Sequence, residues 1–373
     1  MDLVHYGVIG CGMMGQEHLR NIALLPGCAV SAIYEPDAGM AAKVRALAPD
    51  AAMVPTLNAL LERDDYDCLL IASPNFRHVE QMQAIAAARA VPLLVEKPLF
   101  TAEDDAAALR GLADRYTAPI WVAMEYRYMP VIAAFLEQAR AVTGGIQMLT
   151  IREHRFPFLP KVGDWNRFNR YTGGTFVEKC CHFFDLMRLA LGAEPVRVMA
   201  SAGQAVNHRD ERYDGAAPDI LDHGYAVIEF DTGARAMLEL CMFAEGSAYQ
   251  EELSAVGPQG KIEAFVPGPG RFWPQDLGPA PVAALVRSPR APKRPVRVPV
   301  DVEASLLAAG DHNGATFFQH QRFVEMVRGA RAQPDVSLWD GWMAVAMGQA
   351  AQHSAATGQA VAICVDSILG NRG

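Results

Sequence analysis

The stretch that decides the fold is Tyr6-Gly7-Val8-Ile9-Gly10-Cys11-Gly12-Met13-Met14-Gly15. An apolar run leads into the pattern Gly-x-Gly-x-x-Gly, which is typical of a strand, a tight turn and a helix that bind a dinucleotide. Gly10 permits the turn, Gly12 lets the backbone approach a pyrophosphate, and Gly15 lets the helix pack closely on the strand. Met13 and Met14 lie between the last two glycines, and the amino terminus of the helix that follows faces the phosphates.

The residues after this stretch extend the same pattern. Residues 16–25 read as a helix and residues 29–34 as a strand that ends at Glu35. An acidic side chain about 20 residues after the glycines typically binds the ribose hydroxyls of NAD. Glu35 and Asp37 flank a proline, and no adjacent Arg is present to accept a 2′-phosphate. The pattern therefore favours NAD over NADP as the cofactor.

Length, composition and charge exclude several classes of protein. A chain of 373 residues that is 51% hydrophobic has room for two or three globular domains. A net charge of -9 argues against nucleic acid as a partner. We find no apolar stretch of the ~20 residues that a membrane span needs, and no secretory signal. The seven scattered cysteines fit a reducing compartment, so we expect a cytoplasmic enzyme with a small-molecule substrate.

Strands and helices alternate over residues 1–125, which predicts an α/β domain with a doubly wound parallel sheet. Polar residues follow the predicted strands, and because ligands bind beyond the carboxyl ends of such strands, these residues should form a site. They are Ser73-Pro74-Asn75 with His78, Glu96-Lys97, and Glu125-Tyr126-Arg127. Lys97, held by the proline after it, could bind a substrate hydroxyl and stabilise developing alkoxide charge.

Residues 126–373 predict a second domain of the α+β class, for substrate binding and oligomerisation. Strands are expected at 146–153, 196–205, 224–230, 234–242, 251–256 and 261–266, and several alternate apolar and polar residues. Hairpin turns between them indicate an open, mostly antiparallel sheet. We expect a surface loop at 267–299 with one poor strand at 296–300, then helices at 316–328 and 338–356 and a strand at 360–365.

The segment from Gly173 to Gly192 carries a second group of reactive side chains. It reads as one helix that Thr175 caps and Gly192 ends. Glu178 and His182 are four residues apart, so they share a helix face, with Asp185 on the same side. A His one turn from a carboxylate is a candidate general base. Cys180-Cys181-His182 cannot form a tetrahedral metal site because adjacent helical residues point about 100° apart, so no metal is expected.

These motifs together resemble the glucose-fructose oxidoreductase / inositol dehydrogenase (Gfo/Idh/MocA) family over almost the whole chain. The motifs are the glycine fingerprint, Ser73-Pro74-Asn75 with His78, Glu96-Lys97-Pro98, Gly173-Gly174 through His182 and Asp185, and Ser354-Ala355-Ala356-Thr357-Gly358. The resemblance implies a Rossmann domain, and an α+β domain whose sheet forms the interface of a homodimer or homotetramer. It implies a catalytic Lys–acid–His set at Lys97, Glu178 and His182. The chain departs from the family at Glu178, where Asp is usual, and at Lys179, where an apolar residue is usual.

The favoured function is an NAD-dependent dehydrogenase that moves a hydride from a secondary hydroxyl of a cyclic polyol or sugar to the nicotinamide. The expected cofactor-binding residues are Gly10, Gly12, Met13, Met14, Gly15, Glu35, Ser73, Pro74, Asn75, His78, Glu96, Lys97, Trp165 and Arg167. The expected substrate-binding residues are Lys97, Arg127, His154, Arg155, Trp165, Glu178 and His182.

Two other functions stay open at this point. One is an NADP-dependent sugar reductase or a sugar oxidoreductase with a tightly bound cofactor, which the Glu35 and Asp37 pair and the missing export signal argue against. The other is a catalytically inactive, cofactor-sensing regulator. Lys97 and His182 argue against a regulator, because a sensor needs neither an acid nor a base at the nicotinamide.

Overall fold

The amino-terminal part of the chain builds a six-stranded parallel sheet. The computed structural model describes residues 3–364, and the strand order across this sheet is β3-β2-β1-β4-β5-β6. The strands are β1 (Val4–Ile9), β2 (Cys28–Tyr34), β3 (Ala52–Val54), β4 (Cys68–Ile71), β5 (Leu93–Val95) and β6 (Ile120–Val122). This is the order of a doubly wound dinucleotide-binding sheet, whose direction of winding reverses between β1 and β4. The predicted Rossmann sheet is confirmed.

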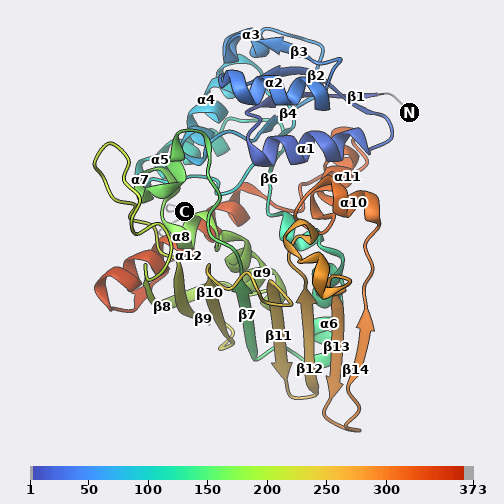
Figure 1. The fold of residues 1–373 in the computed structure, drawn as a ribbon, viewed down its shortest axis with the longest axis vertical. Helices are drawn as coiled ribbons and strands as arrows, with labels where there is room; N and C mark the ends of the chain where they lie inside the picture. The colour runs from blue at the N-terminus through green and yellow to red at the C-terminus, as the bar shows by residue number, and fades with distance from the viewer. Residues whose placement is uncertain (1–2, 365–373) are drawn as a thin grey trace.

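Short helices connect these strands (Figure 1). Every residue of β4, β5 and β6 is buried, which accounts for their continuous apolar sequences, because a parallel strand is covered on both faces. The elements are α1 (Met13–Ala23), α2 (Ala38–Leu47), α3 (Leu57–Leu61), α4 (His78–Ala88) and α5 (Glu103–Ala113), with 3₁₀ turns η1 (Asn75–Arg77) and η2 (Glu125–Tyr128).

The rest of the chain builds a nine-stranded sheet in the order β14-β13-β12-β11-β7-β10-β9-β8-β15. The strands are β7 (Met148–His154), β8 (Pro195–Gly203), β9 (His223–Phe230), β10 (Arg235–Cys241), β11 (Glu251–Gly257), β12 (Gly260–Val266), β13 (Ala284–Pro289), β14 (Val296–Pro299) and β15 (Val361–Ala362). Neighbours pair antiparallel except β7 and β10, which run parallel. The mostly antiparallel sheet is therefore confirmed.

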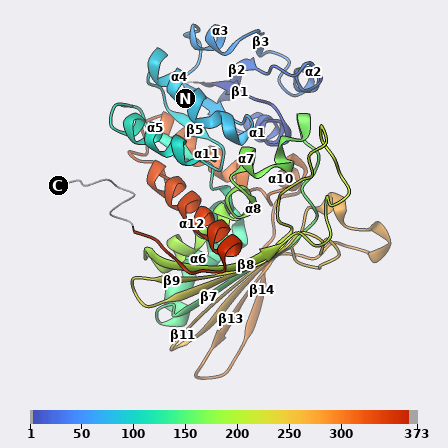
Figure 2. The ribbon, with the colours of Figure 1, turned by 90° about the vertical axis from the view of Figure 1, so that its left-hand side faces the viewer.

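Helices cover one face of this second sheet (Figure 2). Helix α6 packs on β12, and α12 packs on β8 and α9. The elements here are α6 (Pro130–Thr143), α7 (Asn169–Thr172), α8 (Thr175–Glu178), α9 (Cys181–Leu191), α10 (Ala304–Ala309), α11 (Ala315–Val327) and α12 (Leu338–Thr357), with 3₁₀ turns η3 (Val162–Arg167), η4 (Gly270–Phe272) and η5 (Gln275–Leu277). None of the helices within residues 3–364 is long and apolar enough to cross a bilayer.

The carboxy-terminal helices return to the first sheet. Helix α11 packs against α1, and α12 begins beside β6. There Gly341 lies so close that a Cβ atom would come within 2.8 Å of the Val122 side chain. The Val122 amide also donates to the Val336 carbonyl at 3.1 Å. The two sheets are thus joined by a continuous core rather than by a loose linker.

Four sequence predictions need correction. The expected loop at 267–299 contains β13, which pairs with both β12 and β14, and helix α10 follows it. The expected single helix from Thr175 to Gly192 is broken into α8 and α9 at residues 179–180. Thr175 is the first residue of α8 rather than its cap, since its hydroxyl donates to the Leu221 carbonyl at 2.8 Å. The strand expected at 360–365 is β15, and Val365 lies outside the described residues.

Candidate active site

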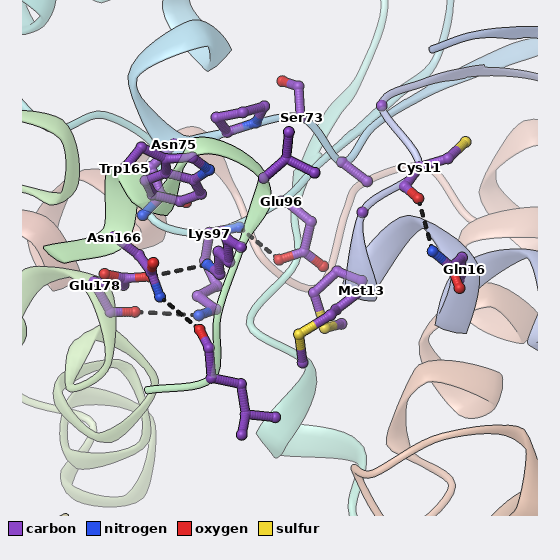
Figure 3. A pocket seen from close by; sticks show the side chains of 18 of the residues that line it. Cys11, Met13, Gln16, Ser73, Asn75, Glu96, Lys97, Trp165, Asn166 and Glu178 are labelled. Carbon is purple, nitrogen blue, oxygen red and sulfur yellow. Dashed lines mark hydrogen bonds and ion pairs between the residues drawn. The ribbon is translucent and has the colours of Figure 1, made fainter. Parts of the chain in front are cut away.

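A cavity of about 710 Å³ lies beyond the carboxyl ends of the parallel strands. The glycine loop and the residues after β2, β4 and β5 form one wall. The loop at 155–168 and helices α8 and α9 form the other. Figure 3 shows side chains from both walls around it, with Lys97 reaching from the end of β5 toward Glu178. This is the crevice in which open α/β sheets bind ligands.

The glycine loop has the shape that a dinucleotide requires. Gly10 has a φ of 85°, and a Cβ atom there would lie 2.6 Å from the Ser73 backbone. A Cβ atom on Gly15 would lie 2.4 Å from the Gly10 carbonyl oxygen, so α1 can pack at this distance only through glycine. At Gly12 nothing lies within 4 Å, and its side-chain position opens onto the cavity. The amino terminus of α1 therefore presents free backbone to a pyrophosphate.

The carboxylate of Glu35 joins the end of β2 to the glycine loop. Its Oε2 accepts from the Cys11 amide at 2.5 Å and its Oε1 from the Asp37 amide at 2.8 Å. Each oxygen keeps a second lone pair for a ribose hydroxyl. Asp37 instead caps α2 by accepting from the Met40 amide at 2.8 Å. Lys43, which sequence reasoning missed, also lines the cavity.

The residues after β4 form a braced turn. Ser73 donates to Gln81 at 2.6 Å, and Asn75 is buried with its side-chain nitrogen unpaired among the described residues. Ser73, Pro74 and Asn75 all line the cavity. His78 does not: its ring nitrogens lie 2.8 Å from the Pro98 carbonyl and 3.1 Å from the Ser73 carbonyl. His78 therefore joins two loops beneath the cavity, which differs from the expected contact with the cofactor.

Lys97 occupies the centre of the cavity wall. Its Nζ donates to the Glu178 carbonyl at 3.1 Å, and its amide donates to the Glu96 carboxylate at 3.0 Å (Figure 3). The peptide bond between Lys97 and Pro98 is cis. Burial disfavours the ammonium, but nearby Cys181, Glu96 and Glu178 outweigh it and raise the pKa of Lys97. The side chain is thus a charged donor at neutral pH.

Glu96 belongs to a buried chain of hydrogen bonds behind Lys97. Its Oε1 lies 2.8 Å from His18 Nε2, and His18 Nδ1 lies 2.8 Å from His320 Nε2. The Tyr6 hydroxyl lies 3.2 Å from the other nitrogen of His320. Burial, followed by His18, holds the pKa of His320 well below its usual range. The chain connects the Glu96-Lys97 segment to α1 and α11 and fixes its position.

His182 lies fully inside the cavity wall, in α9. Its ring stacks on Tyr126 with the centroids 4.1 Å apart and the planes at 8°. Its Nδ1 is buried without a partner among residues 3–364, which leaves Nε2 as the nitrogen that can reach a ligand. Burial holds the pKa of His182 well below its usual range, and the charges of Lys97, Lys179, His312 and Arg155 lower it further. The ring is therefore neutral at pH 7 and able to accept a proton.

Glu178 does not contact His182, which corrects one expected role. The two residues belong to different helices, and Glu178 Oε1 accepts from Lys161 Nζ at 3.0 Å. The ammonium of Lys161 also lies 4.2 Å from the centre of the Trp165 ring. Glu178 Oε2 is buried and has no partner within residues 3–364, so it is able to accept a substrate hydroxyl. Lys161 lies in an irregular loop, where no periodic pattern could have identified it.

The low pKa of His182 predicts the pH dependence of alcohol oxidation. A general base must be deprotonated, so kcat/KM should fall only when the pH drops below this lowered pKa. We expect initial rates to stay level from about pH 7 to pH 9, in place of the rise through neutral pH that an ordinary imidazole would produce. Rates measured from pH 5 to pH 9 check this. A rise between pH 6.5 and 8 that is absent from His182→Ala would contradict the depressed pKa.

Besides Gly15 and His78, three predicted site residues lie outside the cavity lining. The fork of Arg127 binds both oxygens of Asp185 at 2.5 Å, so Asp185 also belongs with Arg127 and not with His182. His154 contacts Glu239 at 3.0 Å on the sheet, and Arg167 contacts Glu211 at 2.9 Å. Arg155 and Trp165 do line the cavity. The ring of Trp165 packs on Phe76, with the centroids 6.0 Å apart.

Lys179 and His312 add two further cations to the wall. The Nζ of Lys179 lies 2.8 Å from Glu153 and donates to the Tyr126 hydroxyl at 2.6 Å, so this unusual Lys fixes the ring that stacks on His182. His312 contacts Glu17 at 2.7 Å. Despite burial, Glu125 and Glu17 raise the pKa of His312 to about 9. Glu17, Glu125 and His312 could together reach a metal ion, but Thr316 and His312 already bind these carboxylates.

Comparison with known proteins agrees with this geometry. Residues 4–124 match the oxidoreductase-family NAD-binding Rossmann fold of Gfo/Idh/MocA proteins, and residues 140–363 match the family's C-terminal alpha/beta domain. Inositol 2-dehydrogenase 2 of Saccharopolyspora erythraea is 28% identical over 95% of this chain and 94% of its own. An inositol 2-dehydrogenase of Leifsonia xyli subsp. xyli is 32% identical over 72% of this chain and 74% of its own.

A solved structure shares the whole fold. The crystal structure of GenD2, from gentamicin A biosynthesis and in complex with NAD, superposes with a TM-score of 0.78 at 21% identity. The match covers 98% of this chain and 97% of that one. At 21% sequence identity, this similarity shows a shared fold only. The arrangement of the two sheets thus also occurs in a protein whose crystal structure contains NAD.

Proposed function

This chain belongs to the Gfo/Idh/MocA family of oxidoreductases, and we propose that it is an NAD-dependent dehydrogenase of a secondary hydroxyl on a cyclic polyol or sugar. One observation carries the proposal: Lys97, a charged donor, and His182, a neutral base, line the same cavity as the glycine loop. The inositol dehydrogenases among the relatives support a polyol or sugar as the substrate.

The chain's own residues have the properties that the reaction needs. When bound, the dinucleotide accepts a hydride at its nicotinamide ring. Lys97 Nζ donates a hydrogen bond to the reacting oxygen and stabilises its developing negative charge. His182 Nε2 removes the hydroxyl proton, and Tyr126 keeps the imidazole in place by stacking. The free oxygen of Glu178 accepts a neighbouring substrate hydroxyl, and Lys161 fixes that carboxylate.

We assign the remaining predicted residues by their position. Gly10, Gly12, Met13, Met14, Glu35 and Ser73-Pro74-Asn75 line the dinucleotide part of the cavity, with Trp165 on the opposite wall. Gly15, Glu96 and His78 act indirectly, by packing and by positioning the loops. A regulator that only senses the cofactor would not need a charged Lys and a neutral His around one space.

A spectrophotometric screen tests the function directly. Purified protein is mixed with NAD and, in separate assays, with inositols, pyranoses and sugar acids, and NADH formation is followed. We expect turnover with at least one of these classes and none without added substrate. Tight NAD binding without any turnover would favour the regulator. NADPH-dependent reduction of the corresponding ketoses in the absence of NAD activity would favour the reductase.

The preference for NAD gives a second testable prediction. The Glu35 carboxylate lies where an adenosine 2′-phosphate would meet it, so kcat/KM with NAD should exceed that with NADP by at least about tenfold, since like charges repel by more than 1.4 kcal/mol at such sites. Glu35→Ser with Pro36→Arg should reduce this ratio. Glu62→Ser removes an exposed carboxylate of the same domain that lies outside the cavity lining, and as the control it should leave this ratio nearly unchanged. Equal turnover with NADP by the wild type would refute the role of Glu35.

We further propose a cytoplasmic homo-oligomer formed through the open face of the nine-stranded sheet. Large apolar side chains are exposed on strands of this sheet, including Met148, Met199, Tyr225 and Val256. Buried thiols such as Cys68 and Cys180 fit a reducing compartment. Light scattering of the purified protein measures the number of subunits.

A further inference from the structure

The wall around His182 contains several cationic side chains, and one of them differs from the others in its contacts. Five cationic side chains line this part of the cavity, and three of them lie within hydrogen-bond distance of a carboxylate. These are Lys161 with Glu178, Lys179 with Glu153, and His312 with Glu17. Lys97, at the end of β5, is the residue that we propose to bind the reacting oxygen. The remaining cation is Arg155, which follows the last residue of β7.

Arg155 is held by local contacts, but the pair of terminal N–H groups at Nη1 and Nη2, here called its open fork, has no acceptor among residues 3–364. Its Nε donates to the Phe156 carbonyl at 3.0 Å, and its guanidinium lies 4.3 Å from the centre of the Phe156 ring. The nearest carboxylate, Glu153, is 3.7 Å from Nη1 and is already paired with Lys179 at 2.8 Å. Within residues 3–364 neither Nη atom has an acceptor at hydrogen-bond distance, although the side chain is only 13% exposed. A nearly buried guanidinium whose terminal N–H groups lack acceptors can donate hydrogen bonds to a bound ligand.

The chemistry of this acceptor follows from the shape of the fork. A guanidinium presents two parallel N–H groups that match the two oxygens of a carboxylate. Arg155 also lies near the reaction: it lines the same cavity as Lys97 and His182, and the Glu153 beside it binds Lys179, which donates to the Tyr126 that stacks on His182. Four cations surround a base that must accept a proton, and an anion bound among them would offset part of this charge. The base would then recover some of its proton affinity when the substrate arrives.

We propose that the substrate is a sugar acid or polyol acid, whose carboxylate is bound by the open fork of Arg155 while its reacting hydroxyl lies between Lys97 and His182. This inference rests on the proposed dehydrogenase function and names its substrate class. One open fork supplies the two donors that a carboxylate needs, and phosphate, the other anion that a guanidinium binds, is a separate arm of the test. Arg155 is therefore the residue that selects an acidic substrate over a neutral one.

Matched pairs of sugars test the proposal. Initial rates of NAD reduction are measured for D-glucose and D-glucuronate, for D-galactose and D-galacturonate, and for D-glucose 6-phosphate. We expect kcat/KM for an acid to exceed that of its neutral twin by at least about tenfold, the worth of one charge-assisted pair. In Arg155→Gln this ratio should fall by about tenfold or more, mainly through KM. Arg152→Gln is the control, because Arg152 lies three residues earlier on β7, pairs with Glu252 and is outside the cavity lining.

Each outcome decides the proposal. Neutral sugars oxidised as well as their acids, a preference for the phosphate, or an equal loss for both twins in Arg155→Gln would overturn it while leaving the dehydrogenase intact. If no sugar of any class is oxidised, the dehydrogenase proposal fails. The acid site is then judged by binding: with NADH present, the uronates should raise the Tm of the wild type but not of Arg155→Gln. Absence of that shift would overturn the site as well.

Discussion

Replacing His182 with Ala should lower the turnover of alcohol oxidation by about 10²–10⁴-fold, the usual contribution of a general base. The reason is specific to this site: His182 is a neutral imidazole whose Nε2 can reach the cavity that Lys97 also lines. Steady-state kinetics with NAD and the best substrate from the screen measure the loss. NAD affinity should change little, because His182 lies on the wall opposite the glycine loop.

Two controls separate this chemical role from packing. His182 stacks on Tyr126, so the Ala variant is also expected to lose stability, and its Tm should be measured beside its activity. His353→Ala removes an exposed His on α12 and should leave both quantities unchanged. Added imidazole should restore part of the turnover of His182→Ala, since the truncated side chain leaves room for it. A folded His182→Ala protein with near-normal turnover would reduce His182 to a packing residue.

The parts of the fold that could be predicted are those that depend on neighbouring residues in the sequence. Short apolar runs bounded by glycine, proline and polar residues predicted the parallel sheet of residues 1–125, and the ends of its strands placed Ser73 and Lys97 at the cavity. The same local signals failed at β13. Its apolar residues sit in a segment rich in proline and arginine, and only pairing with β12 and β14 makes that segment a strand.

The part of the site that could not be predicted depends on contacts between distant residues. Arg127 follows a strand end, as a ligand-binding residue would, but Asp185 holds it from 58 residues away. The spacing of Glu178 and His182 predicted a contact on one helix. The helix is interrupted at residues 179–180, where the Lys179 side chain contacts Glu153 and Tyr126. The spacing of apolar residues does not predict a polar contact between residues that are distant in the sequence.

Lys97 shows how local and distant contacts combine, and its removal should have the second largest effect. In Lys97→Met the apolar stem is kept and the ammonium is lost. We expect turnover to fall by about 10²–10³-fold, the typical result of removing one preorganised electrostatic contact from a water-poor site. NAD binding, measured by quenching of protein fluorescence, should stay within a few fold of the wild type. Lys293→Met, on an exposed turn, is the surface control.

The pH dependence of the rate distinguishes a catalytic role of Lys97 from a role in neutralising the carboxylates around it. Glu96 and Glu178 help to raise its pKa, so the ammonium stays charged through the whole range in which His182 is neutral. The wild type should therefore keep its rate as the pH rises to about 9, and Lys97→Met should show the same level profile at a lower rate. If Lys97 only balanced the carboxylates around it, its loss would change the Tm and the profile and spare the turnover at the optimum. A folded Lys97→Met protein with nearly normal turnover would thus remove Lys97 from the mechanism.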